Sequence, residues 1–131
     1  KINLKGCKEF EGVSGSATVF RDLLRTTTAE TLFTYEDEFF EGLSAITLNK
    51  YQGGNVYYIG CGVDENIMDK LADKILKDSK IETIKSPKGV EVVRRSINNE
   101  EKYFVMNHTD KTQQLGDKVI KPYEAFVVDS I

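Results

Sequence analysis

The stretch EGLSAITLNKYQGGNVYYIGCG, residues 41–62, decides the fold class predicted for this chain. Residues 44–48 form a short apolar run, and residues 56–59 (VYYI) are side chains that fit a pleated, buried surface. Between them, residues 52–55 (QGGN) have turn chemistry that permits positive φ. The stretch therefore predicts two strands and a tight turn between them.

A helix is predicted immediately after this stretch. Apolar residues recur at helical spacing from Ile67 to Leu76 and form one continuous apolar face. Asp64 is a natural N-cap, and Lys77 lies near the negative end of the helix dipole. We expect the apolar face to cover the preceding pair of strands.

The residues before the central stretch carry weaker signals. Glycines interrupt residues 1–17, which predicts irregular or short extended segments. Residues 18–25 fit a helical face about as well as a bent strand, and their β neighbours favour the strand. Residues 31–35 alternate as a strand does, and the acidic residues 36–38 predict a solvated loop that leads into Phe39 and Phe40.

The pattern changes after the helix. Residues 78–89 are polar and end in a predicted turn, SPKG, so they indicate a boundary. Residues 90–95 alternate, and NNEE at 98–101 links them to the apolar run at 103–106 as in a hairpin. A weaker strand is predicted at 112–115 and a closing strand at 125–128. These strands predict a small antiparallel sandwich or meander.

Composition excludes several classes of function. The chain has 131 residues, a net charge of −3 and 30% charged residues, with no basic stripe to meet nucleic-acid phosphates. It has no apolar run long enough to cross a bilayer and no signal-peptide pattern, so we expect a cytoplasmic protein. The chain starts at Lys1, which indicates a piece of something longer. Cys7 and Cys61 are expected to be reduced thiols.

Three local patterns resemble catalytic sites but have simpler interpretations. Asn99-Glu100 resembles an Asn-Glu acid pair, yet it falls in a predicted polar turn. Gly60-Cys61-Gly62 lacks the glycine spacing of a nucleophile elbow, and small residues for close strand–helix packing explain it better. His108, the only histidine, is expected to be structural. No catalytic residue, metal site or cofactor is predicted.

The order of motifs resembles the C-terminal part of a glycoside hydrolase family 42 β-galactosidase. In the first half, the motifs AETL at 29–32, Y…FFEG at 35–42 and SAITLNKYQGGNVYYIG at 44–60 resemble the family's trimerisation domain. This chain has Ser44 where the family usually has Pro, and its glycine spacing is offset by one. In the second half, PKGVEVVRR at 87–95, FVMNHT at 104–109 and PYEAFVV at 122–128 resemble the family's C-terminal β domain.

The resemblance implies a fold and a role. It implies an α/β unit at residues 1–83, a partial glutamine-amidotransferase-like sheet of Rossmann type with one clear helix. An antiparallel β domain follows at 84–131. It also implies self-association as a homotrimer, with Phe39, Phe40, Tyr57 and Tyr58 as candidate subunit-interface residues. The family's two catalytic glutamates lie on a preceding barrel, so a β-galactoside would bind only there.

Two alternatives from other classes stay open. One is a stand-alone carbohydrate-binding or oligomerisation module. Tyr57, Tyr58, Tyr103, Phe104 and Tyr123 could line a sugar platform, although at strand spacing such residues are more often core or interface. The other is an amidotransferase-like cysteine enzyme, which would depend on Cys61.

Overall fold

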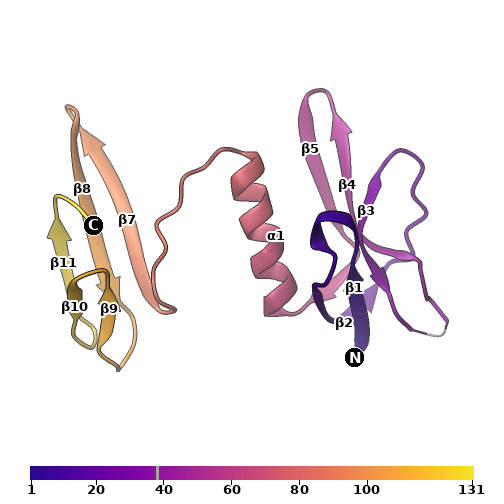
Figure 1. Cartoon of the computed structure of the whole chain (residues 1–131), viewed down its shortest axis with the longest axis horizontal. Coiled ribbons are helices and arrows are strands. Elements are labelled where there is room, and N and C mark those ends of the chain that lie inside the picture. The colour runs from indigo at the N-terminus through magenta and orange to yellow at the C-terminus, as the bar shows by residue number, and fades with distance from the viewer. Residues whose placement is uncertain (38) are drawn as a thin grey trace. The chain divides into compact units, whose positions relative to one another are not determined.

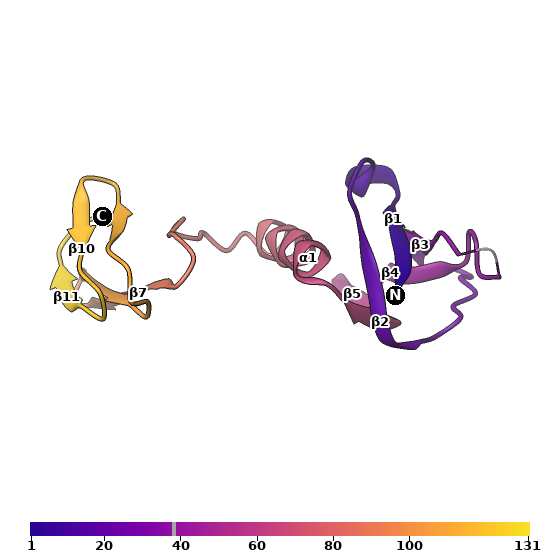
Figure 2. The same ribbon diagram turned by 90° about the horizontal axis from the view of Figure 1, so that it is seen from below.

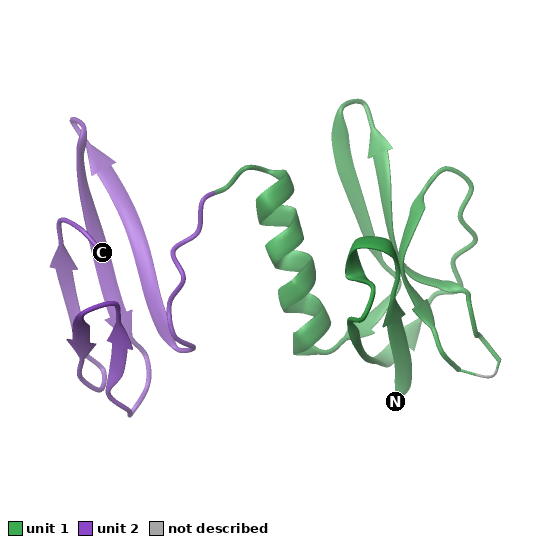
Figure 3. Cartoon of the chain, viewed as in Figure 1, with its two compact units in different colours: residues 1–81 green, residues 82–131 purple. Residues whose placement is uncertain are grey.

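The computed structural model describes residues 1–37 and 39–131, which divide into two compact units, Lys1–Ile81 and Glu82–Ile131 (Figure 3). Glu38, part of the predicted acidic loop, lies outside the described residues. The first unit contains β1 (Ile2–Gly6), η1 (Lys8–Phe10), β2 (Ser14–Arg21), β3 (Glu30–Tyr35), β4 (Ser44–Tyr51), β5 (Gly54–Ile59), β6 (Cys61–Val63) and α1 (Glu65–Asp78). The second contains β7 (Val90–Ile97), β8 (Glu100–Asn107), β9 (Gln113–Leu115), β10 (Lys118–Ile120) and β11 (Ala125–Val128).

The strands of the first unit form one antiparallel sheet in the order β5-β4-β3-β1-β2-β6 (Figure 1). The outermost strands of this order, β5 and β6, are separated in the chain by Gly60 alone. The Gly60 N–H donates to the Ala45 carbonyl (2.9 Å), and its carbonyl accepts from the Asp22 N–H (2.6 Å). One extended segment thus pairs first with β4 and then with β2, which makes the sheet barrel-like.

Gly60 is required by this close approach of three backbones. A Cβ at this position would lie 3.1 Å from the Ala45 carbonyl oxygen and 3.3 Å from Cβ of Asp22. Both contacts are tighter than ordinary van der Waals distances, so a larger residue would push the β4 and β2 sides apart. The glycine is explained by closure of the sheet.

The predicted fold class of the first unit is wrong. A Rossmann-type sheet has parallel strands joined by crossover helices, whereas every pairing in this sheet is antiparallel and α1 follows its last strand. The predicted turn already excluded a parallel pairing of β4 with β5. Gln52 (φ 47°) and Gly53 (φ 81°) join β4 to β5 directly, and so short a turn connects only antiparallel strands.

The predicted helix is confirmed as α1, with Asp64 as its N-cap. The Asp64 carboxylate accepts from the Ile67 N–H at 3.1 Å. Ile67 and Leu71 are buried in the core of the first unit, but Met68 is 45% exposed and Ile75 is 37% exposed. Only part of the apolar face of α1 therefore packs against the sheet, and the rest is exposed.

The first 21 residues are more regular than predicted. Figure 2 shows β1 and β2 running together as a hairpin that carries η1 in its connection, with Ile2 opposite Ala17 and Lys5 opposite Ser14. The strand favoured for residues 18–25 is present but ends at Arg21. A register shift between Thr18 and Arg21 forms a bulge in its pairing with β6.

The second unit is built on the predicted hairpin. β7 and β8 pair from Val90 opposite Asn107 to Ile97 opposite Glu100, and β11 adds to the other side of β8. The weaker predicted strand is β9, which pairs with β10, a strand that the sequence did not indicate. The core of this unit contains Val90, Val105, Leu115 and Ile120.

Asn107 holds the loops of the second unit together from a buried position, 3% exposed. Its amide nitrogen donates to the carbonyls of Lys111 (2.8 Å) and Lys121 (2.9 Å). Its amide oxygen accepts from the backbone N–H (3.0 Å) and the hydroxyl (2.8 Å) of Thr109. Buried polar groups need such partners, so this side chain orders the two loops that flank the β9–β10 pair.

Candidate functional site

The four predicted interface residues divide into two exposed and two largely internal side chains. Phe39 is 86% exposed and Tyr58 is 50% exposed. The Tyr58 hydroxyl donates to the Asp22 carboxylate at 2.8 Å, which fixes the ring on the outer face of β5. These two are available to a partner.

Phe40 and Tyr57 pack against the core of the first unit. The Phe40 ring lies 6.5 Å from the Tyr35 ring, and the Arg21 guanidinium lies 4.7 Å above it. The Tyr57 hydroxyl donates to Asp78 at 2.8 Å. Burial, together with this hydrogen bond to the carboxylate, raises the pKa of Tyr57 to about 12. Both residues stabilise the unit and offer little surface to a partner.

A further apolar surface lies at the bulge of β2, where no sequence pattern predicts one. Val19 is 96% exposed with φ 71°, and Phe20 is 52% exposed. A β-branched residue with positive φ is an outlier, and the chain holds it on the surface. In the sequence, residues 18–25 fit a helical face about as well as a bent strand, and this ambiguity does not locate the bulge.

Cys61 is buried, 2% exposed, at the start of β6 and three residues before the N-cap of α1. Burial raises the pKa of its thiol, although a hydrogen bond from Tyr35 partly opposes this. A nucleophilic cysteine needs an accessible thiolate, so this environment favours a packing role. Cys7 and Cys61 are both free thiols in the structure.

The other patterns that resemble catalytic sites also lie in structural surroundings. Asn98 (φ 51°) and Asn99 (φ 66°) form the β7–β8 turn, and Glu100 is an exposed first residue of β8. His108 is exposed, and its Nε2 lies 3.0 Å from Glu91 Oε2 across the sheet. Within residues 1–37 and 39–131, no group of three or more potential metal-ligating side chains is present. No helix in the described part of the chain is long and apolar enough to cross a membrane.

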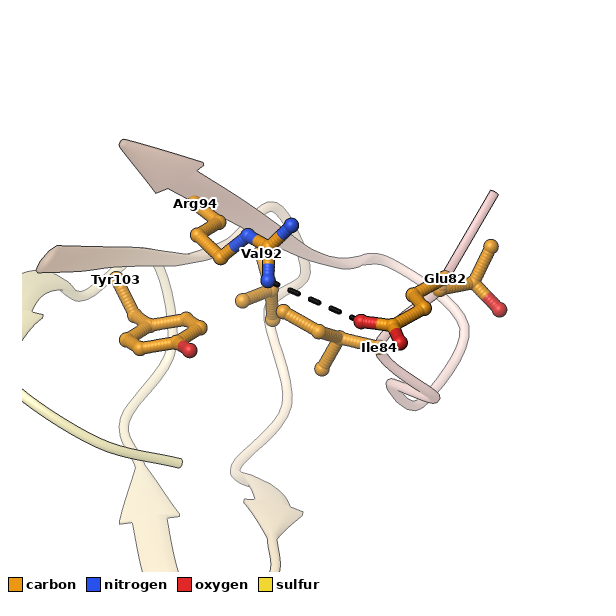
Figure 4. A pocket seen from close by; sticks show the side chains of 6 residues that line it. Glu82, Ile84, Val92, Arg94 and Tyr103 are labelled. Atoms are coloured by element: carbon orange, nitrogen blue, oxygen red, sulfur yellow. Dashed lines mark ion pairs between the residues drawn. The ribbon is translucent and has the colours of Figure 1, made fainter. Parts of the chain in front are cut away.

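The second unit contains a groove of about 490 Å³ between β7–β8 and the segment before β7 (Figure 4). Its lining residues are Glu82, Thr83, Ile84, Val92, Arg94 and Tyr103. Arg94 and Tyr103 are a cross-strand pair, and Figure 4 shows both side chains on the groove side of the sheet. The sequence pattern indicates Tyr103 as one residue of a sugar platform, but no pattern indicates the other residues that line the groove.

Charged groups surround the tyrosine. The Arg94 guanidinium lies 3.7 Å from Glu101 and 4.0 Å from Glu82. The Tyr103 hydroxyl donates to Glu101 at 2.9 Å, and this hydrogen bond raises the pKa of Tyr103. An aromatic ring, a guanidinium and two carboxylates therefore meet beside the apolar side chains of Ile84 and Val92.

Comparison with protein families finds two matches. Residues 5–82 match the family described as "Beta-galactosidase trimerisation domain", and residues 89–129 match "Beta-galactosidase C-terminal domain". Among curated proteins, the β-galactosidase LacZ of Heyndrickxia coagulans is 33% identical over 72% of this chain. The β-galactosidase Pbg of Clostridium perfringens is 34% identical over 78% of this chain. The chain spans 14% and 15% of the lengths of these two relatives.

Solved structures share the fold. Gan42B, a GH42 β-galactosidase from G. stearothermophilus, superposes with a TM-score of 0.83 over 98% of this chain, at 22% identity. The β-galactosidase of Rahnella sp. R3 gives a TM-score of 0.81 over 97% of this chain, also at 22% identity. In each case the match covers 21% of the solved chain.

Proposed function

Because this chain belongs to the glycoside hydrolase family 42 β-galactosidases, we propose that it forms the non-catalytic C-terminal part of such an enzyme and that its first unit supports subunit association. The observation that carries the proposal is the match of residues 5–82 to the family named for trimerisation. The longer, cytoplasmic protein would hydrolyse terminal non-reducing β-D-galactosides with retention. Its catalytic glutamates would lie outside the residues of this chain.

The surface of the first unit supports association. β5 is an outer strand that pairs only with β4 in the strand order, and it carries Val56 (51% exposed) and Tyr58 (50% exposed). An outer strand with exposed apolar side chains is a ready surface for a second chain. Phe39 adds a second exposed ring, on the loop before β4. In a closed assembly, each subunit would use the same patch or a complementary pair of patches.

Light scattering on a sizing column tests this proposal with the chain as it stands. At tens of micromolar we expect a discrete oligomer, with a trimer favoured by the family match, and a mass well above 14.8 kDa. The variants Tyr58→Ser and Phe39→Ser should shift the population towards the monomer. Tyr51→Ser is the matched control, since Tyr51 is a 63% exposed tyrosine at the end of β4.

Two outcomes would contradict the proposal. The first is a monodisperse monomer of the unmodified chain at tens of micromolar. The second is an oligomer whose mass and dissociation are unchanged by Tyr58→Ser, by Phe39→Ser and by both together. Circular dichroism on each variant checks that the fold survives, and both side chains are exposed enough for this to be expected.

A further inference from the structure

The groove of the second unit continues the face of the sheet that forms this unit's core. Val92 pairs with Val105, and the next pair on the same face is Arg94 with Tyr103. Val105 is fully buried beside Leu115 and Ile120 of the β9–β10 pair, whereas Arg94 is exposed and Tyr103 is half-buried. This face of the sheet is therefore covered by β9 and β10 at Val105 and uncovered at the Arg94–Tyr103 pair. The groove lies at this uncovered end, the open end.

The open end combines an apolar floor with polar walls. Ile84, Val92 and the ring of Tyr103 provide apolar surface, while Arg94, Glu82 and Thr83 provide donors and acceptors. Ligand sites likewise place apolar surface beside convergent polar groups. The distances from Arg94 to Glu101 (3.7 Å) and Glu82 (4.0 Å) exceed those of direct hydrogen bonds. A small polar group can therefore bridge the guanidinium and a carboxylate.

The charges define the class of ligand. One guanidinium faces two carboxylates, so the site has an excess of negative charge and disfavours a phosphate or a carboxylate. A hydroxyl group suits it, because one hydroxyl both accepts from a guanidinium and donates to a carboxylate. The Tyr103 ring offers an apolar face to the C–H groups of a ring that carries such hydroxyls. We propose that this groove binds one pyranose unit of a neutral carbohydrate.

The sheet side of the groove and the end of the segment that precedes β7 are held in shape before any ligand arrives. The hydrogen bond from Tyr103 to Glu101 fixes the ring, and the β7–β8 ladder fixes Arg94 beside it. The segment before β7 is tied down by Ser86, whose hydroxyl donates to the Val90 carbonyl at 2.7 Å, and by the Val90 N–H, which donates to the Pro87 carbonyl at 2.9 Å. Such preorganisation reduces the entropy that binding must overcome. The site would hold carbohydrate without cleaving it, and it does not depend on association of the first unit.

Titration of the ¹⁵N-labelled chain with β-1,4-galactobiose, followed by amide chemical shifts, tests the inference. We expect saturable shifts at Thr83, Arg94 and Tyr103, with little change in the first unit. Tyr103→Ala should weaken binding about tenfold through loss of the stacking surface, whereas Tyr103→Phe should lose less. Arg94→Gln should also weaken binding because it removes the charged donor fork. Tyr123→Ala is the control, since Tyr123 is a 72% exposed tyrosine of the same unit that does not line the groove.

The inference fails if galactobiose and lactose both give no saturable shifts up to their solubility limits. It also fails if the shifts map to Tyr58 or another surface, or if Arg94→Gln binds as the wild type does. The Arg94 side chain is half exposed, so we expect Arg94→Gln to fold even if Tyr103→Ala does not. Its binding result alone then decides whether the groove holds the sugar. Light scattering on the same samples measures the oligomeric state, so the absence of sugar binding can be distinguished from the absence of subunit association.

Discussion

Asn107 is a single residue on which the loops of the second unit depend. It contacts three carbonyls, those of Lys111, Ile120 and Lys121, together with the backbone and side chain of Thr109, and it is 3% exposed. Asn107→Ala should destabilise this unit by about 3 kcal/mol, because several buried polar groups lose their partners together. Urea unfolding followed by amide signals of β7 and β8 measures the change. Asn66→Ala is the control, since Asn66 is exposed and its side chain donates to the Ser14 carbonyl alone. If the two variants lowered stability equally, Asn107 would not be the residue that holds these loops.

Cys61 and Cys7 should differ in reactivity. Burial raises the pKa of the Cys61 thiol and blocks access to it, whereas Cys7 is partly exposed. In the folded chain near neutral pH, a thiol reagent should label Cys7 first and Cys61 only as the unit opens. Cys7→Ser isolates the Cys61 rate. Rapid stoichiometric labelling of Cys61 in that variant would contradict the packing role.

For single residues, the sequence predicts the role of a side chain that acts on its neighbours in the chain. It does not predict the role of a side chain whose hydrogen-bond partners lie in other loops. The turn at Asn98-Asn99 and the cap at Asp64 were predictable, because each acts on its own neighbours in the chain. The role of Asn107 was not, since its acceptors include Lys111 and Lys121 in loops without periodicity. The groove residues Glu82 and Arg94 come together through a loop that no local pattern describes.

The N-terminus of α1 depends on one carboxylate. Burial alone would raise the pKa of Asp64, but hydrogen bonds from the Ile67 N–H, the Ser16 hydroxyl and the Ser16 N–H lower it below its usual value. Because the pKa falls on folding, the carboxylate stabilises the fold above its unfolded pKa of about 4, and this stability is lost as pH falls through the folded pKa. Asp64→Ala should cost about 1–2 kcal/mol at neutral pH.

Urea midpoints at neutral pH and at about pH 3 check this pH dependence, because the gap between wild type and variant should narrow as Asp64 protonates. Asp73→Ala is the control on the same helix, where the side chain is exposed. A gap that stays constant across this range would show that the carboxylate charge is not the stabilising feature.

The bulge in β2 stores strain at Val19. A β-branched residue with φ 71° costs about 1–2 kcal/mol, while its 96% exposed side chain gains almost no burial. Val19→Gly should therefore stabilise the chain by about 0.5–1 kcal/mol, after allowance for the greater entropy of glycine in the unfolded state. Val56→Gly on β5 is the control and should destabilise, since Val56 lies in a regular strand. Thermal unfolding compares the two, and a less stable Val19→Gly would refute the strain argument.

For the whole molecule, several elements were predictable from short-range patterns, whereas the closure of the sheet was not. The β4–β5 turn, α1, the β7–β8 hairpin and the closing strand follow from local pattern, and the structure confirms each. The Rossmann-type sheet was implied by the resemblance and not by the turn, and the antiparallel pairing of all six strands contradicts it. Closure through Gly60 depends on contacts with Ala45 and Asp22, distant positions that periodicity in one sequence does not link.

The last prediction concerns activity of the isolated chain. Retaining glycosidases need two carboxyl groups about 5 Å apart on either side of the scissile bond, one as acid and one as nucleophile. Glu100 is an exposed residue beside the β7–β8 turn, and Glu82 and Glu101 both lie beside the Arg94 guanidinium, at 4.0 Å and 3.7 Å, as partners of one ion-pair cluster. The purified chain should therefore not turn over an aryl β-galactoside, even if its groove holds sugar. Glu100→Gln and Glu101→Gln serve as paired controls, since turnover abolished by either one would place a catalytic carboxylate in this chain and overturn its non-catalytic role.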